Sequence, residues 1–267
     1  MAIYIFDQTM KRMGDNVDDM KWYREQILGK TDAPVRYVFT KMPEYKDVKM
    51  YEEVGSDIKQ LVGMYQYFTD NHALEHSVKI EDKLEELKKR LHYTNVKRTN
   101  TEIRLSKDGY TIASIILDKE YCSEIYYFNY TKLLRQEIYT DGVAYTNYYI
   151  TAKSENGLYA KLTRRTFYNG DGSVAYDQIF EEEKEWFVFP DGNIFTKEQF
   201  VIEFIKKLNL SKQDVVFLDN SVSDEVVRAI FTFGKEARII VLAYIGQRKC
   251  KSGNDEDVFR EGYYYDW

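Results

Sequence analysis

The sequence predicts an α/β fold into which an antiparallel β meander is inserted. Three observations indicate this class: an α/β pattern in residues 1–70, a series of alternating segments separated by turns in residues 100–192, and a second α/β pattern in residues 193–267. Strands that alternate with helices form parallel sheets, whereas short strands joined by tight turns form antiparallel ones. We therefore predict a discontinuous α/β domain (1–70 and 193–267), a helical connector (71–99) and an inserted antiparallel sheet domain (100–192).

The first α/β segment combines apolar runs with helical periodicity. Residues 3–6 and residues 35–40 (VRYVFT) are predicted as buried parallel strands. Apolar side chains at three- and four-residue spacing predict a helix over residues 17–28, which Gly29 would end. The same spacing in SDIKQLVGMYQY predicts an amphipathic helix over residues 56–67.

The connector is rich in charge. KIEDKLEELKKRLH, residues 79–92, predicts a short solvated helix with its leucines on one side. His72 and His76 are four residues apart and His92 lies nearby, a spacing that can bind zinc. Because no third ligand follows at metal spacing, we predict no metal site and no cofactor.

The inserted domain is marked by its turns. KDG, TDG, ENG, NGDG and PDG separate the segments between residues 100 and 192, and their glycines allow the positive φ that tight hairpins need. The pattern predicts six to eight strands joined by hairpins. The chain holds 24 tyrosines, a residue that favours strands and whose ring can also stack on sugars.

The last segment returns to strand–helix alternation. Thr196 is predicted to cap the helix KEQFVIEFIKKLNL, and VVFLD, residues 215–219, is a buried strand. SDEVVRAIFTFG predicts a further helix that Gly234 ends, and RIIVLAYI, residues 238–245, predicts another strand. Together with the first segment, this order predicts one parallel sheet.

Composition excludes several classes of protein. The 267 residues carry 38 basic and 44 acidic side chains, a net charge of −6, which argues against nucleic acid as a partner. The sequence has no run of 18 apolar residues, so we predict no membrane-spanning helix. The first residues, MAIYIFDQTMKRMG, lack the pattern of a signal peptide. Two cysteines, Cys122 and Cys250, fit a reducing compartment, so we expect a cytoplasmic location.

Four segments carry a resemblance that covers essentially the whole chain. They are KLTRRTFYNGDGSVAYDQIF and FVFPDGNIFTKEQFVIEFIKKLNLSKQDVVFLD, with VRYVFTKM and MYQYFTDN upstream. They resemble the N-terminal half of a bacterial glycosyltransferase family. That family includes the accessory-Sec enzymes that modify serine-rich repeat adhesins and the related poly(glycerol-phosphate), or teichoic acid, glycosyltransferases. The resemblance implies a GT-B fold, with two Rossmann-like domains across a donor cleft and an antiparallel sheet inserted in the first.

Two places depart from the family pattern. A glycine-rich turn usually follows the first strand and would hold donor phosphate; here Gly14, Asp15 and Asn16 stand there. The acids of residues 15–19 would repel a diphosphate, and the alternative is that they stabilise the first turn of a helix. A histidine cluster usually follows the strand RIIVL, whereas this chain has residues 243–246, AYIG.

Five further positions are candidate ligand residues. Asp219 ends a predicted strand where α/β proteins place ligand-facing carboxylates, and Tyr244 lies near the end of the next predicted strand; both are candidates for an acceptor or ligand cleft. Arg164, Arg165 and Tyr168 are candidates for a binding surface of the sheet domain. The two arginines are neighbours on a strand and should point to opposite faces, toward an acidic or phosphate partner or toward residues 181–185 as cross-strand pairs.

Two functions are carried forward. The resemblance implies the acceptor-side half of a retaining glycosyltransferase that moves a hexose or N-acetylhexosamine from a UDP-sugar to a protein Ser/Thr or wall-polymer hydroxyl. This chain alone would lack donor chemistry, and no catalytic residue is assigned to it. The alternative is a non-catalytic module that steadies a partner glycosyltransferase or captures its acceptor. A separate, structural hypothesis is a homo-oligomer with the meander as its subunit interface.

Overall fold

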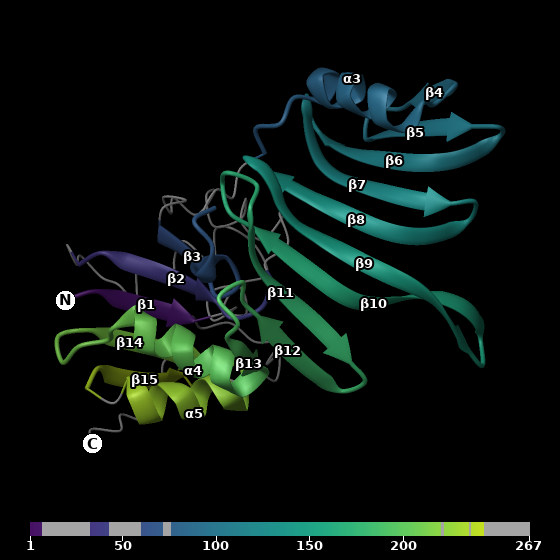
Figure 1. The fold of residues 1–267 in the computed structure, drawn as a ribbon. Coiled ribbons are helices and arrows are strands. Elements are labelled where there is room, and N and C mark those ends of the chain that lie inside the picture. Colours follow the sequence, from purple (N-terminus) through teal and green to yellow (C-terminus); the bar gives the residue numbers. More distant parts are fainter. Residues whose placement is uncertain (7–32, 43–59, 72–75, 220–221, 235, 243–267) are drawn as a thin grey trace, which may run out of the picture. The chain divides into compact units, whose positions relative to one another are not determined.

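The computed structural model describes the following residues: 1–6, 33–42, 60–71, 76–219, 222–234 and 236–242. The chain divides into two compact units, shown in Figure 1. Met1–Tyr67 and Glu198–Trp267 form the first, called the parallel-sheet unit, and Phe68–Lys197 form the second, called the antiparallel-sheet unit. The helix predicted over residues 17–28 lies outside the described residues.

The parallel-sheet unit contains five strands in the order β15-β14-β1-β2-β3, and every pair is parallel. The strand order reverses at β1, because β2 and β3 follow on one side and β14 and β15 lie on the other. All four side chains of β1 are buried, as expected for a strand covered on both faces. The strands are β1 (Ile3–Phe6), β2 (Val35–Phe39), β3 (Leu61–Gly63), β14 (Val215–Asp219) and β15 (Arg238–Leu242).

The amphipathic helix predicted over residues 56–67 is wrong where the structure describes it. Leu61–Gly63 form β3, which pairs with β2, and Gln66–Phe68 form a short 3-10 helix, η2. Strand β2 offers backbone groups on that side that must be paired, and Gly63 disfavours a helix. Pairing in the sheet therefore overrides the local apolar spacing.

Two predicted helices are confirmed in this unit. In α4 (Lys197–Leu208), the apolar face of Phe200, Phe204 and Leu208 is buried. In α5 (Asp224–Phe233), the Gly234 N–H closes the last turn by donating to the Ile230 carbonyl at 2.7 Å. The strand predicted over residues 238–245 is described as far as Leu242.

The carboxylate of Asp214 joins the start of the chain to β14. It accepts the Ala2 N–H at 2.6 Å, and it accepts the Ser211 N–H at 2.9 Å and the Ser211 hydroxyl at 2.8 Å. Burial raises the pKa of Asp214, but these hydrogen bonds outweigh burial and hold the pKa below its ordinary value. The residue thus fixes the β1–β14 pairing at its end.

The antiparallel-sheet unit is a ten-stranded meander in which every strand pairs with the next in sequence, from β4 to β13. Figure 1 shows it as one curved sheet. The strands are β4 (Asn95–Arg98), β5 (Glu102–Lys107), β6 (Tyr110–Asp118), β7 (Tyr121–Asn129), β8 (Lys132–Thr140), β9 (Gly142–Ser154), β10 (Gly157–Tyr168), β11 (Val174–Glu181), β12 (Lys184–Val188) and β13 (Ile194–Thr196). Eight of them, β5 to β12, lie within residues 100–192, as the turn pattern predicts, and the final glycine of each turn has a positive φ.

Helix α3 (Ile80–Leu91) confirms the helix predicted in the charged stretch. Its Ile80 and Leu87 are buried in one core with Ile103 and Ile125 of the sheet. The helix therefore completes the core of the antiparallel-sheet unit. Among the described residues, no helix has the length and apolar composition required to cross a membrane.

We predict that Asp214→Asn lowers the free energy of unfolding by about 1–3 kcal/mol at neutral pH, since the hydrogen bonds would lose their charged acceptor. The folded pKa is depressed, so this stabilisation is present above the unfolded pKa of about 3.9 and is lost as the pH falls below it. Urea unfolding should show the gap between wild type and variant closing below about pH 4.

The control is Glu236→Gln, a change at an exposed residue of the same unit, which should give no such gap. A difference between wild type and Asp214→Asn that stays constant down to about pH 3 would contradict the assignment.

Candidate functional site

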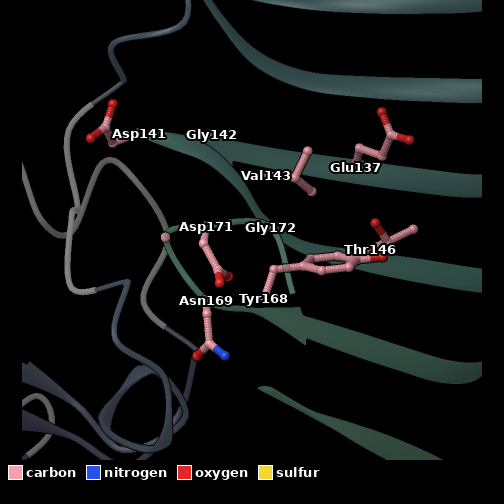
Figure 2. A pocket seen from close by; sticks show the side chains of 10 residues that line it. Glu137, Asp141, Gly142, Val143, Thr146, Tyr168, Asn169, Asp171 and Gly172 are labelled. Atoms are coloured by element: carbon pink, nitrogen blue, oxygen red, sulfur yellow. The ribbon is translucent and has the colours of Figure 1, made fainter. Parts of the chain in front are cut away.

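A pocket of about 400 Å³ opens where two turns of the antiparallel-sheet unit lie side by side (Figure 2). Glu137, Thr146 and Tyr168 line it from strands β8, β9 and β10. Residues 141–143 line it from the β8–β9 turn, and residues 169–172 line it from the β10–β11 turn. The volume lies at the lower end of the range for small-molecule sites.

Strand register places these side chains on one face. Glu137 lies directly opposite Thr146, and Thr146 lies opposite Thr166. On the other side Glu137 faces Ile125, which belongs to the core that α3 covers. We call this side the α3 face of the sheet. The pocket therefore lies on the α3 face, over β8, β9 and β10 and not under the helix itself.

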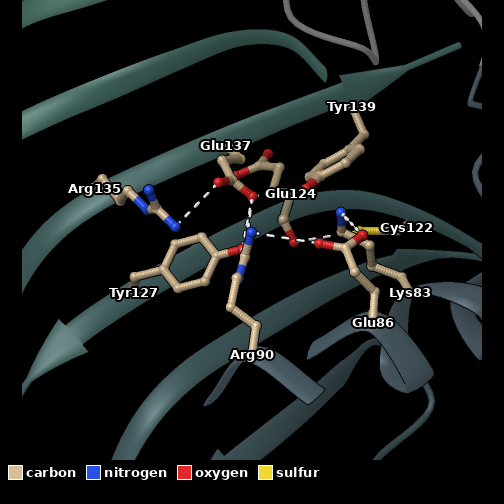
Figure 3. A network of polar contacts seen from close by, with 9 residues as sticks. All are labelled: Lys83, Glu86, Arg90, Cys122, Glu124, Tyr127, Arg135, Glu137 and Tyr139. Atoms are coloured by element: carbon tan, nitrogen blue, oxygen red, sulfur yellow. Dashed lines mark hydrogen bonds and ion pairs between the residues drawn. The ribbon is translucent and has the colours of Figure 1, made fainter. Parts of the chain in front are cut away.

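Glu137 is a buried carboxylate at the floor of the pocket, only 6% exposed. It accepts hydrogen bonds from the hydroxyls of Tyr127 and Tyr139, both at 2.6 Å (Figure 3). Burial, together with the adjacent Glu137 charge, raises the pKa of both phenols, so they stay protonated and donate. Arg135 Nη2 lies 3.3 Å from the carboxylate and Arg90 Nη2 lies 4.0 Å from it.

Helix α3 supplies cations to the same cluster. The Arg90 guanidinium donates to the Tyr127 hydroxyl and lies over the Tyr127 ring, 5.2 Å from its centroid. Lys83 Nζ lies 4.7 Å from the centroid of Tyr139 and 2.6 Å from the Glu86 carboxylate. The buried charge is thus paired and hydrogen-bonded, as a buried charge must be.

Tyr168, one of the residues singled out in the sequence, lines the pocket. Burial is the main reason that its pKa is raised to about 12, and the neighbouring side chains of Thr146 and Tyr148 add smaller effects. Figure 2 shows the ring reaching toward Thr146, with Val143 and Glu137 across from it. The ring of Tyr168 therefore forms a wall of the pocket, with Thr146 beside it.

The two neighbouring arginines lie on opposite faces of the sheet. Arg164 is exposed on the α3 face, where its guanidinium carbon stands 4.2 Å from the ring centroid of Tyr148. Arg165 is on the other face, where its Nε donates to Asn147 at 2.7 Å and its guanidinium lies over Tyr145 at 5.1 Å. Only Arg164 therefore shares a face with Tyr168 and the pocket.

The remaining candidate positions are not brought to this pocket. Asp219 is the last residue of β14, at the carboxyl end of a strand beside the point where the strand order reverses. Gly14, Asp15, Asn16 and Tyr244 lie outside the described residues, and their roles stay predictions. Within the described part of the chain, no group of His, Cys, Asp and Glu is arranged to hold a metal ion.

Sequence reasoning missed Glu137 and Thr146. The two turns were visible as TDG and NGDG, but their proximity depends on the register of β8, β9 and β10, which contains β-bulges. A carboxylate within a segment of alternating apolar residues was the available signal, because such a residue needs partners when its face is buried.

The chain is similar in sequence to known proteins. Residues 94–191 match the family described as the GtfA extended beta-sheet domain. The chain is 25% identical, over 99% of its length, to the UDP-N-acetylglucosamine–peptide N-acetylglucosaminyltransferase GtfA subunit of Streptococcus parasanguinis, of which the match covers 52%. The resemblance drawn from the sequence is thereby confirmed, and the chain spans about half the length of the curated relatives it matches.

Solved structures show a similar fold. A GtfA/B complex matches 90% of this chain and 48% of the solved chain, with a TM-score of 0.73 and 24% identity. A pneumococcal O-GlcNAc transferase GtfA, in complex with UDP and GlcNAc, matches 90% of this chain and 47% of its own, with a TM-score of 0.70 and 24% identity. These neighbours support a GT-B-like fold that includes the large antiparallel sheet.

We predict that Glu137→Gln lowers the free energy of unfolding by about 1–3 kcal/mol, because two phenols and two guanidinium groups would lose their charged partner. Urea unfolding measures the loss. Glu183→Gln removes the same charge at an exposed position of the same unit and should change stability little. Equal effects of the two substitutions would contradict the role given to Glu137.

Proposed function

We propose that this chain is the acceptor-side, N-terminal half of a retaining GT-B glycosyltransferase. The complete enzyme would move a hexose or N-acetylhexosamine from a UDP-sugar to a protein Ser/Thr hydroxyl or to a wall-polymer hydroxyl. The observation that carries the proposal is the similarity to GtfA subunits along 99% of the chain, together with the match of residues 94–191 to their sheet domain.

The parallel-sheet unit supports the proposal as the Rossmann-like domain of such an enzyme. Its order, β15-β14-β1-β2-β3, reverses between β1 and β14. Ligands of open α/β sheets bind outside the carboxyl ends of the strands at such a reversal. Asp219, at the end of β14, stands at that edge and is our candidate for the acceptor or ligand cleft.

The antiparallel-sheet unit would bind the acceptor or a partner subunit. Its α3 face carries the exposed Arg164 guanidinium on Tyr148, next to the pocket of Tyr168. A stacked guanidinium keeps its outward N–H groups for hydrogen bonds to backbone carbonyls or hydroxyls of an extended chain. Since one similar structure is a GtfA/B complex, a partner glycosyltransferase subunit belongs to the proposal. A cytoplasmic location, expected from the two cysteines, belongs to it as well.

The alternative is a non-catalytic module that steadies a partner glycosyltransferase or captures its acceptor. It is favoured by Asp15 and Asn16 at the expected glycine-rich turn and by AYIG at the expected histidine cluster. Both functions place acceptor or partner binding on this chain. They differ in whether the complete protein handles a donor.

We predict that this chain binds a Ser/Thr-rich peptide and does not bind UDP-N-acetylglucosamine when each is titrated by calorimetry. The acids at residues 15–19 oppose a diphosphate, whereas the α3 face offers an aromatic surface and the guanidinium of Arg164. Donor binding with turnover by this chain would overturn the assignment of an acceptor-side half. If neither ligand binds, the result would favour the module that only steadies a partner.

Arg164→Ala tests the face, since it should weaken peptide binding about three- to tenfold while leaving the fold intact. Its matched control is Arg98→Ala, which removes an exposed arginine, paired with Glu81, from the edge strand of the same sheet. Equal effects of the two substitutions would show that the peptide responds only to net charge.

A further inference from the structure

The charges of the pocket disfavour anionic ligands. Among the described residues that line it, the ionisable side chains are the carboxylates of Glu137, Asp141 and Asp171 and the phenol of Tyr168, and none is basic. A phosphate placed beside Asp141 and Asp171 would be repelled, since no described residue that lines the pocket is basic. The pocket is therefore unsuited to the diphosphate of a nucleotide sugar.

The same charges do not make a strong cation site. Glu137 is offset by Arg135 and by Arg90, and it already accepts two phenol hydrogen bonds. Asp141 and Asp171 are exposed at the mouth, where an ion pair with a ligand is screened by water. They accept the Ser77 hydroxyl at 2.6 Å and the Ser173 N–H at 2.8 Å, and a carboxylate has lone pairs beyond one such bond.

The walls and rim together are amphipathic. The ring of Tyr168 and the side chain of Val143 give apolar surface, while Thr146 and Asn169 add neutral polar groups. A ligand that matches this arrangement has an apolar C–H face and many hydroxyl donors at its edge. A volume of about 400 Å³ holds one or two pyranose rings and is too small for a folded partner.

We propose that this pocket binds one neutral, hydroxyl-rich saccharide unit. Its ring would lie against Tyr168, and its hydroxyls would donate to the carboxylates of Asp141 and Asp171. The inference rests on the proposed function, which supplies the sugar: the bound saccharide would be one that is already attached to the acceptor. The pocket would then hold glycosylated acceptor on the sheet domain.

The test is ligand-observed NMR and calorimetry of this chain with N-acetylglucosamine, glucose, glucose 6-phosphate and glucosamine. We expect the neutral sugars to bind and glucose 6-phosphate to bind at least about tenfold more weakly than glucose. Absence of binding by both neutral sugars overturns the proposal. So does glucosamine binding more than about tenfold tighter than N-acetylglucosamine, because the pocket would then be a cation site.

Tyr168→Ala should weaken binding of the neutral sugars about tenfold, whereas Tyr168→Phe, which keeps the ring, should change it about twofold. Tyr159→Ala is the matched control, an exposed tyrosine of the same strand outside the pocket. Equal losses in Tyr168→Ala and Tyr159→Ala would overturn the assignment.

If Tyr168→Ala fails to fold, a substitution of a pocket carboxylate tests the proposal instead. Asp171→Asn should reduce the difference in binding affinity between glucose and glucose 6-phosphate, while Asp191→Asn should not. Both aspartates accept the N–H two residues ahead in an Asp-Gly turn, at 2.8 and 3.0 Å, but only Asp171 lines the pocket. If Asp171→Asn leaves this difference in affinity unchanged, the proposal is contradicted.

Failure of the inference and failure of the proposed function give different results. If the Ser/Thr-rich peptide binds and the neutral sugars do not, the saccharide pocket is wrong and the acceptor-side function stands. If the sugars bind in a Tyr168-dependent way and the peptide does not, the pocket stands and its source of sugar must be sought elsewhere.

Discussion

The buried Glu137 carboxylate sets conditions that much of the antiparallel-sheet unit must meet. A charge that is 6% exposed needs donors and counter-charges, and Tyr127, Tyr139, Arg135 and Arg90 supply them. Because Arg90 comes from α3, the helix can dock only where its guanidinium reaches the Tyr127 hydroxyl. The same carboxylate forms the floor of the pocket, so helix docking and pocket shape share one cause.

The opposite face of the sheet is held by a polar row that runs across the strands. Gln136, Asn147, Arg165 and Gln178 lie opposite one another on four consecutive strands and are joined by side-chain hydrogen bonds, such as Asn147 Nδ2 to Gln136 Oε1 at 3.0 Å. A register slip of one residue would turn every member to the other face. The row therefore fixes the register that brings the two turns of the pocket together, and it explains why Arg165 is structural while Arg164 is available to a ligand.

The two units depend on contacts of very different range. Each strand of the meander pairs with its sequence neighbour, so local turn chemistry nearly decides its topology. In the parallel-sheet unit, β1 pairs with β14 across most of the chain, and Asp214 binds Ala2 at that junction. The helix expected over residues 56–67 failed for the same reason: Leu61 and Gly63 are placed by pairing with β2, which apolar spacing cannot report.

The features that depend on near neighbours could be predicted from the amino-acid sequence. The Asp-Gly and Asn-Gly turns, the alternating segments, the helices α3, α4 and α5, and the opposite directions of Arg164 and Arg165 all follow from local backbone and side-chain geometry. Strand β3, the docking of α3 and the partners of Glu137 became visible only in the three-dimensional structure. It also brought Tyr168 to Thr146 and to the β8–β9 turn, because those contacts depend on register and burial, which no local pattern encodes.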